Sequence, residues 1–108
     1  MIEWLFAFAV TCAIELAVVF WLGPRHPRRL AVGLVAQLVT HPFVWLAMAS
    51  LPGSQLARLL CVELWATLVE TAVYKRFLGL RGRDAFALSA LANAASLLLC
   101  AAIALVFF

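Results

Sequence analysis

The stretch that decides the fold of this chain is IEWLFAFAVTCAIELAVVFWL (residues 2–22), which GPRHPRR (residues 23–29) follows at once. The first part supplies the ~20 mostly apolar residues that a helix needs to cross a bilayer. Gly23-Pro24 is a typical helix stop, and the arginines after it mark one side of a membrane. The run lacks the basic start of a signal peptide, so we expect a membrane-spanning helix that is retained.

Three further apolar runs follow, and they account for nearly all of the remaining chain. We expect spans at about 2–22, 30–51, 55–76 and 84–107, with Asp84 as the N-cap of the last. The 108 residues are 68% hydrophobic and 12% charged, whereas soluble domains are about 45–50% apolar and about 25% charged. The apolar runs are continuous rather than alternating, which argues against a β-barrel. The sequence therefore predicts an all-α integral membrane protein, a single four-helix transmembrane bundle over residues 1–108.

The basic residues predict the orientation of this bundle. Seven of the eight lie in or beside the first and third linkers: Arg25, Arg28, Arg29, Lys75, Arg76, Arg81 and Arg83. By the positive-inside rule both basic loops are cytoplasmic and both termini face outward. We expect these residues to contact anionic lipid headgroups rather than nucleic acid, in what we interpret as a bacterial cytoplasmic (inner) membrane.

A few polar residues interrupt the predicted spans. Polar and ionisable side chains are costly inside a bilayer, so each of them has to be explained. The ionisable ones are Glu15, His41, Glu63 and Glu70, and their neutral companions include Gln37, Thr40, Thr67, Asn93 and Ser96. Their spacing is helical: Glu63, Thr67 and Glu70 share one face of the third span, as Asn93 and Ser96 do in the fourth. One polar stripe on each helix predicts that the four stripes face one another.

Depth within the bilayer narrows this expectation to particular residues. At ~1.5 Å per residue from the cytoplasmic ends, Glu15, Gln37 and Glu70 lie roughly 10 Å deep. Asn93 and His41 lie roughly 14–16 Å deep, and Glu63 roughly 20 Å. We therefore expect Glu15, Gln37, Glu70 and Asn93 to form one cluster, with His41 and Glu63 farther from the basic loops.

Two interpretations of the cluster stay open. In the functional one, Glu15 and Glu70 bind a proton or cation, because a carboxyl group in low dielectric can load and release a proton near neutral pH. In the structural one, buried polar groups only join helices by hydrogen bonds worth about 1 kcal/mol or less. The functional interpretation is favoured for the two carboxyl groups, since a neutral residue could join helices at lower cost. Glu63 fits either interpretation.

The triplet Thr40-His41-Pro42 stands within the second span. Proline removes one backbone hydrogen bond and kinks a helix, and interrupted helices at mid-bilayer often line binding sites. His41 is then a proton relay or a metal ligand, or alternatively part of a packing kink in which it bonds a neighbouring Glu or Thr. Trp45 and Trp65 are expected to face lipid or to fill the bundle, more often than to line a vestibule for an organic cation.

Motifs of known chemistry are absent from the sequence. It has no His-Glu-x-x-His zinc motif, no glycine-rich phosphate loop, no serine nucleophile motif and no haem-attachment motif. We therefore expect no cofactor, leave a metal open, and regard a small intramembrane enzyme using Glu63, Glu70 and His41 as the least favoured function.

The outline of the chain is similar to that of the small multidrug resistance transporters, which are four-span chains of about this length with a glutamate in the first span. Glu15 in Ala13-Ile14-Glu15-Leu16 occupies a comparable place. The third span departs from that family, because the segment around Trp65 has no glycine and carries two further carboxylates. The resemblance implies only that such a unit needs a dimer or larger assembly for transport.

Two functions follow from these observations. The first is a proton- or cation-coupled transporter that acts as an oligomer, with Glu15 and Glu70 as carriers, His41 as relay, and Gln37 and Asn93 as orienting groups. The second is a non-catalytic accessory subunit of a larger membrane complex, in which the polar stripes would bind partner helices or hold the bundle together.

Overall fold

The computed structural model describes residues 2–107, without the side chains at 2–4, 104 and 107. In this range the chain forms four α-helices and no strand: α1 (Ile2–Leu22), α2 (Arg29–Ser50), α3 (Gln55–Leu78) and α4 (Gly82–Phe107). The all-helical class is confirmed, and each helix begins and ends within two residues of the predicted position.

Local sequence explains where the helices end. After α1 the Gly23 N–H still bonds the Val19 carbonyl at 2.9 Å, and Pro24 then stops the helix. Ser54 caps α3, because its Oγ accepts the Ala57 N–H at 3.1 Å. At the other end of α3, Gly79 takes the left-handed conformation (φ 67°) that glycine adopts at low cost.

The expectation that Asp84 is the N-cap of the last helix is wrong. Helix α4 begins at Gly82, and the Ala85 N–H bonds the Arg81 carbonyl at 2.8 Å, so Asp84 lies inside the first turn. Its carboxylate still has a physical role there, since negative charge near a helix N-terminus is stabilised by the helix dipole.

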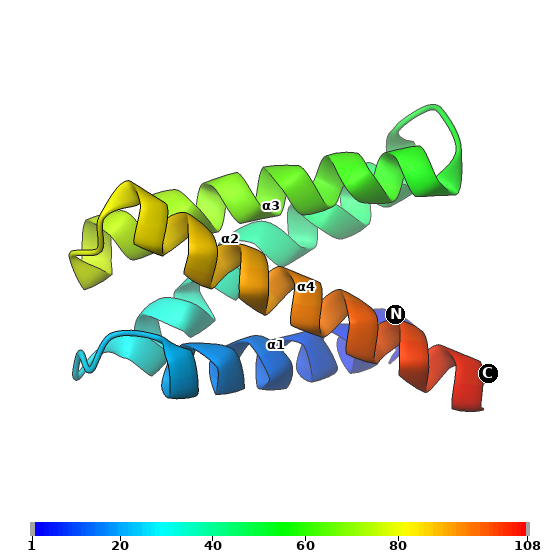
Figure 1. Ribbon diagram of the computed structural model, residues 1–108. Coiled ribbons are helices and arrows are strands. Elements are labelled where there is room, and N and C mark those ends of the chain that lie inside the picture. Colours follow the sequence, from blue (N-terminus) through cyan, green and yellow to red (C-terminus); the bar gives the residue numbers. More distant parts are fainter. Residues whose placement is uncertain (1, 108) are drawn as a thin grey trace.

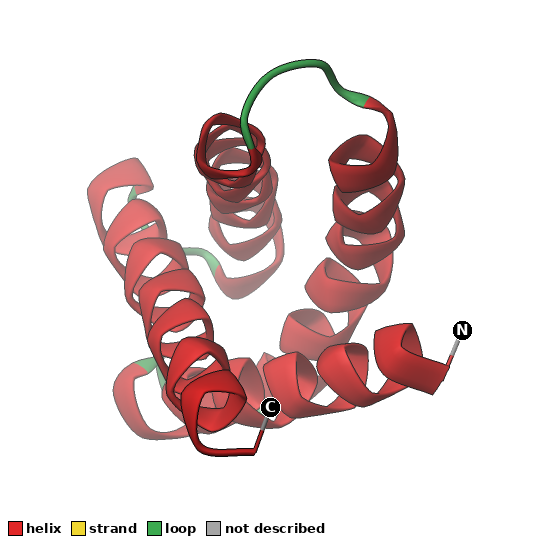
Figure 2. Ribbon diagram, turned by 90° about the vertical axis from the view of Figure 1, so that its right-hand side faces the viewer, coloured by secondary structure: helices red, strands yellow, loops and turns green. Residues whose placement is uncertain are grey.

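The helices form a ring in which each contacts its two neighbours (Figures 1 and 2). Helix α1 contacts α2 and α4, and α3 contacts α2 and α4, while the diagonal pairs make no backbone contact over the described residues. Gly33 allows α1 and α2 to approach, because a Cβ at this position would lie 2.9 Å from the Leu16 Cδ2 atom. The ring thus encloses one interior that all four helices face.

The two ends of the ring differ in charge. Figure 1 shows the α1–α2 and α3–α4 linkers at one end, here called the basic end, and both termini with the α2–α3 loop at the other, the terminal end. All seven basic residues of the predicted cytoplasmic side lie at the basic end, and all but Arg29 are exposed. Arg29 is half-buried, with its guanidinium 4.8 Å from the centre of the Phe20 ring.

Burial in this chain is the reverse of that in a soluble protein. Among the described side chains, nine buried residues are polar or charged, and ten are apolar. Large apolar side chains cover the outside, with Leu105 88% and Trp21 78% exposed. Water-soluble proteins seldom bury acids or expose so much apolar surface. This distribution suits a protein surrounded by lipid.

Three helices, α1, α2 and α4, are long and apolar enough to cross a membrane. Helix α3 is as long, but its 24 residues include five charged ones: Arg58, Glu63, Glu70, Lys75 and Arg76. Two of these stand at its last turn and one near its first, so the apolar length of α3 is shorter than that of its neighbours. Its place as a fourth span remains a prediction.

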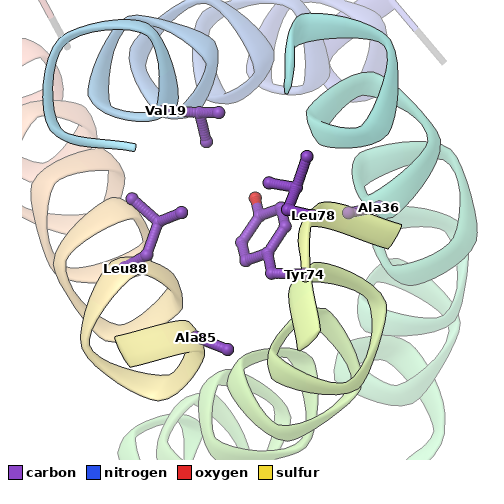
Figure 3. Close-up of a cluster of buried hydrophobic side chains, with 6 residues drawn as sticks. All are labelled: Val19, Ala36, Tyr74, Leu78, Ala85 and Leu88. Carbon is purple, nitrogen blue, oxygen red and sulfur yellow. The ribbon is translucent and has the colours of Figure 1, made fainter. Parts of the chain in front are cut away.

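Near the basic end the interior is filled by an apolar layer, which consists of Val19, Ala36, Tyr74, Leu78, Ala85 and Leu88. Figure 3 shows these side chains, which come from all four helices, pointing into the enclosed space. Val19, Ala36, Tyr74 and Ala85 are fully buried. The layer therefore closes the interior toward the basic end.

Candidate functional site

A polar layer lies about one helical turn beyond the apolar layer, on the side of the terminal end. Glu15 precedes Val19 by four residues on α1, and Gln37 follows Ala36 on α2. Both side chains are buried, and Gln37 Nε2 donates to Glu15 Oε1 at 2.7 Å. This short bond fixes the carboxyl group of α1 against α2.

Glu70 receives hydrogen bonds from two other helices. It precedes Tyr74 by four residues on α3 and is 1% exposed. Asn93 Nδ2 of α4 donates to Glu70 Oε1 at 3.0 Å, and Thr40 Oγ1 of α2 lies 3.1 Å from Glu70 Oε2. The Asn93 amide is itself held, because Nδ2 also donates to the Ser89 carbonyl at 2.9 Å.

The carboxyl groups of Glu15 and Glu70 interact with each other, and both line the same cavity. They come from α1 and α3, which are diagonal in the ring, so their side chains meet across its centre. A hydrogen bond between two carboxyl groups needs a proton on one of them, because two carboxylates side by side repel. The contact therefore provides one position for a bound proton.

The Thr40 hydroxyl has two acceptors within reach. Its Oγ1 lies 2.9 Å from the Ala36 carbonyl and donates to Glu70 Oε2 at 3.1 Å, yet a hydroxyl has a single hydrogen. Thr40 therefore donates fully to one of these two oxygens at a time, and when it donates to Glu70 it stabilises a negative charge on that carboxyl group.

A cavity of about 170 Å³ extends from the polar layer toward the terminal end. Glu15, Gln37, Thr40, Glu70 and Asn93 line its inner part. Its other lining residues lie nearer the terminal end and include Ala7, Val44, Glu63, Leu97 and Cys100. Since one water takes about 30 Å³ of liquid volume, a polar space of this size has room for a few waters or one small cation.

His41 lies on the wall of the same cavity, and it is 9% exposed. Its Nε2 accepts the indole N–H of Trp45 at 3.0 Å, one turn along α2, and its ring packs 4.9 Å from that of Phe8. A ring nitrogen that accepts a hydrogen bond carries no proton, so His41 is neutral in this arrangement. Helix α2 continues through Pro42 to Ser50.

The remaining predicted residues are not in direct contact with the carboxyl pair. Glu63 is half-buried on the cavity wall, and no hydrogen bond joins it to Glu15 or Glu70. Thr67 contributes through its backbone carbonyl, which accepts the Ser89 hydroxyl at 2.9 Å. The Ser96 hydroxyl donates to the Asn93 carbonyl at 3.2 Å.

The expected meeting of Glu15, Gln37, Glu70 and Asn93 is thus observed, and Thr40 joins them directly. Trp45 is a contact that the sequence interpretation missed, although its spacing of four residues from His41 places both on one helical face. No group of three or more His, Cys, Asp or Glu side chains in the described part of the chain is arranged to hold a metal ion.

Comparison of this chain with protein-family models, curated protein sequences and solved structures finds no match. The geometry of the polar layer therefore carries the functional argument.

Proposed function

We propose that this chain is a four-span membrane protein whose carboxyl pair, Glu15 and Glu70, takes up and releases a proton or a small cation, as the working site of a small oligomeric transporter. The observation that carries the proposal is that two buried carboxyl groups from diagonal helices interact at one cavity. Neutral amides and hydroxyls would be enough to join the helices by hydrogen bonds. Two adjacent carboxyl groups interact favourably only when one of them is protonated, and a purely structural role does not explain this need for a proton.

The hydrogen bonds around the pair support a binding role. Gln37 and Asn93 donate to one oxygen of Glu15 and of Glu70, respectively, and so hold both carboxyl groups in the ring's centre. Each donor stabilises a negative charge on its partner when the proton leaves. The amides therefore orient the carriers, whereas the proton moves between Glu15 and Glu70.

Access to the pair supports a direction for uptake. The apolar layer closes the basic end, while the cavity reaches from the pair toward the terminal end. In the predicted orientation this is the outer side of the membrane. His41 and Glu63, on the cavity wall, serve as relay groups between the terminal end and the pair.

The interior of one chain is small for a substrate pathway, so we propose that transport uses a homo-oligomer in a bacterial inner membrane. The apolar outer surface is compatible with both lipid and a second copy. At the basic end the exposed cations would contact anionic headgroups.

Reconstitution into liposomes tests this function. With a membrane potential imposed and a pH dye inside, we expect proton flux from the wild type and at least a ten-fold loss in Glu15→Gln and in Glu70→Gln. Asp84→Asn is the matched control, because it makes the same acid-to-amide change at an exposed position of the basic end. Its flux should equal that of the wild type.

Unchanged proton and cation flux in both glutamine variants would contradict the carrier role. If the chain instead gave no flux alone and was recovered in fixed stoichiometry with another membrane protein, the accessory-subunit interpretation would replace it.

A further inference from the structure

A second pocket lies near the terminal end, between α2 and α3. It has a volume of about 410 Å³, within the range of small-molecule sites, and is lined by Val44, Trp45, Met48, Ala49, Gln55 and Arg58. Four of its lining side chains are apolar. The two polar ones, the amide of Gln55 and the guanidinium of Arg58, both come from the first turn of α3. We call it the Arg58 pocket.

No described residue neutralises the charge of this pocket. No described carboxylate lies within ion-pair distance of Arg58, and Glu63, five residues along α3, points to another side of the helix. Arg58 Nη1 makes one long hydrogen bond, 3.4 Å to the Leu51 carbonyl. Its Nε is buried without any partner. A ligand in the pocket therefore meets the Nη groups, which carry four of the five N–H donors of a guanidinium.

The guanidinium selects the chemistry of the ligand. The two Nη groups of arginine form a planar pair of donors that matches two oxygens of a phosphate or carboxylate, and their positive charge repels cations. Arg58 lies only three residues into α3, about 5 Å along the helix axis. In a spanning bundle this depth is close to the headgroups, with the apolar walls at the level of the acyl chains.

We propose that the Arg58 pocket binds an oxyanion carried on an apolar chain, of which a phosphate-bearing membrane lipid is the natural example. The phosphate accepts from Arg58 and Gln55, and the chain lies along Trp45 and Met48. This site is separate from the headgroup contacts at the basic end, since Arg58 is the one Lys or Arg of the sequence outside that group. Val44 lines both this pocket and the cavity of the carboxyl pair, so a bound lipid lies beside the way into that cavity.

Fluorescence of Trp45 tests the proposal. The purified chain in neutral detergent is titrated with phosphatidic acid that has brominated acyl chains, which quench nearby indoles, and the same titration of Trp45→Phe gives the background from the other tryptophans. We expect selective quenching of Trp45 at a phosphatidic acid concentration at least five-fold below that needed for the uncharged diacylglycerol with the same chains. Arg58→Gln should remove this difference. Arg83→Gln, at an exposed position of the basic end, should keep it.

A competition experiment with inorganic phosphate distinguishes a lipid headgroup from a free phosphate ion as the bound oxyanion. Phosphate added alone at millimolar concentration should leave the lipid in place; displacement of the lipid would make the free ion the ligand and overturn the role of the apolar chain. If Arg58→Gln folds poorly, Ala49→Phe fills the pocket with Arg58 intact and without a new indole, and it should weaken quenching by a comparable factor. Equal titration curves for the wild type and either variant would overturn the proposal.

Discussion

The apolar layer and the polar layer are built on the same four helices, one turn apart, but their side chains interact in different ways. In the apolar layer Leu78 and Leu88 fill space without any demand for partners, and the buried hydroxyl of Tyr74 has none among the described residues. In the polar layer Glu15 and Glu70 are held by directional bonds from other helices. In lipid no hydrophobic force drives helices together, so close packing and hydrogen bonds must do so. The comparison suggests that the first layer seals the interior and the second provides its chemistry.

The largest effect on the free energy of unfolding is expected in the apolar layer. Tyr74→Ala removes a fully buried ring and leaves a cavity, for which we expect a loss of about 3 kcal/mol. Titration with sodium dodecyl sulfate in mixed micelles measures it. Tyr74→Phe is the control: its hydroxyl has no hydrogen-bond partner, so its removal should cost less than about 0.5 kcal/mol. A loss in Tyr74→Phe as large as in Tyr74→Ala would show that the hydroxyl is bonded.

A smaller loss is expected from the hydrogen bonds of the polar layer. Asn93→Ala removes the amide that donates to Glu70, and interhelical bonds in membranes are worth about 0.6 kcal/mol on average and about 1.7 at most. We expect a loss of about 1 kcal/mol in the free energy of unfolding, measured by the same titration. A double-mutant cycle with Glu70→Ala isolates the bond, and a coupling energy near zero would mean that the two side chains do not interact.

The free energy of unfolding is also expected to change when Gly33, where α1 and α2 approach each other, is enlarged. An alanine at position 33 would crowd the end of the flexible Leu16 side chain, whereas one at 82 would meet nothing within 4 Å. We expect Gly33→Ala to be less stable than Gly82→Ala by about 1 kcal/mol. Equal stability of the two variants would indicate that the helices are farther apart at Gly33 than the structure has them.

The smallest effect on stability should come from the residues proposed to carry the function. In Glu15→Gln or Glu70→Gln the new amide supplies the hydrogen that the shared proton supplied, so we expect a change below about 0.5 kcal/mol alongside the loss of flux. A loss of more than about 2 kcal/mol would instead give the pair a mainly structural role.

Much of this arrangement followed from periodicity and depth along the sequence. The predicted depths of Glu15, Gln37, Glu70 and Asn93 fall in the same half of the expected spans, and the four residues lie on polar stripes. These two features were enough to predict that they meet. The hydrogen-bond pattern could not be predicted, because it depends on side-chain rotamers. Counting residues from the basic ends of the predicted spans showed that Glu63 and His41 lie farther along their helices. It could not show how far their side chains lie from those of Glu15 and Glu70.

Other features depend on packing that spacing alone does not determine. Asp84 has the chemistry of an N-cap, but the helix begins earlier, at Gly82, because the backbone of Arg81 can already accept the first bond. Trp45 reaches His41 through a rotamer that places its indole N–H one turn back along α2. The Arg58 pocket requires the relative positions of α2 and α3, which no local pattern in either helix contains.

Infrared spectroscopy of the protein in lipid tests most directly whether Glu15 and Glu70 share a proton. We expect a band of a protonated carboxyl group near neutral pH whose frequency shifts in Glu15→Gln and also in Glu70→Gln, because each substitution removes one of the two groups that share the proton. Glu63→Gln is the matched control, since Glu63 has no hydrogen bond to the pair, and it should retain the band. Absence of the band from the wild type, or its loss in Glu63→Gln alone, would contradict the shared proton.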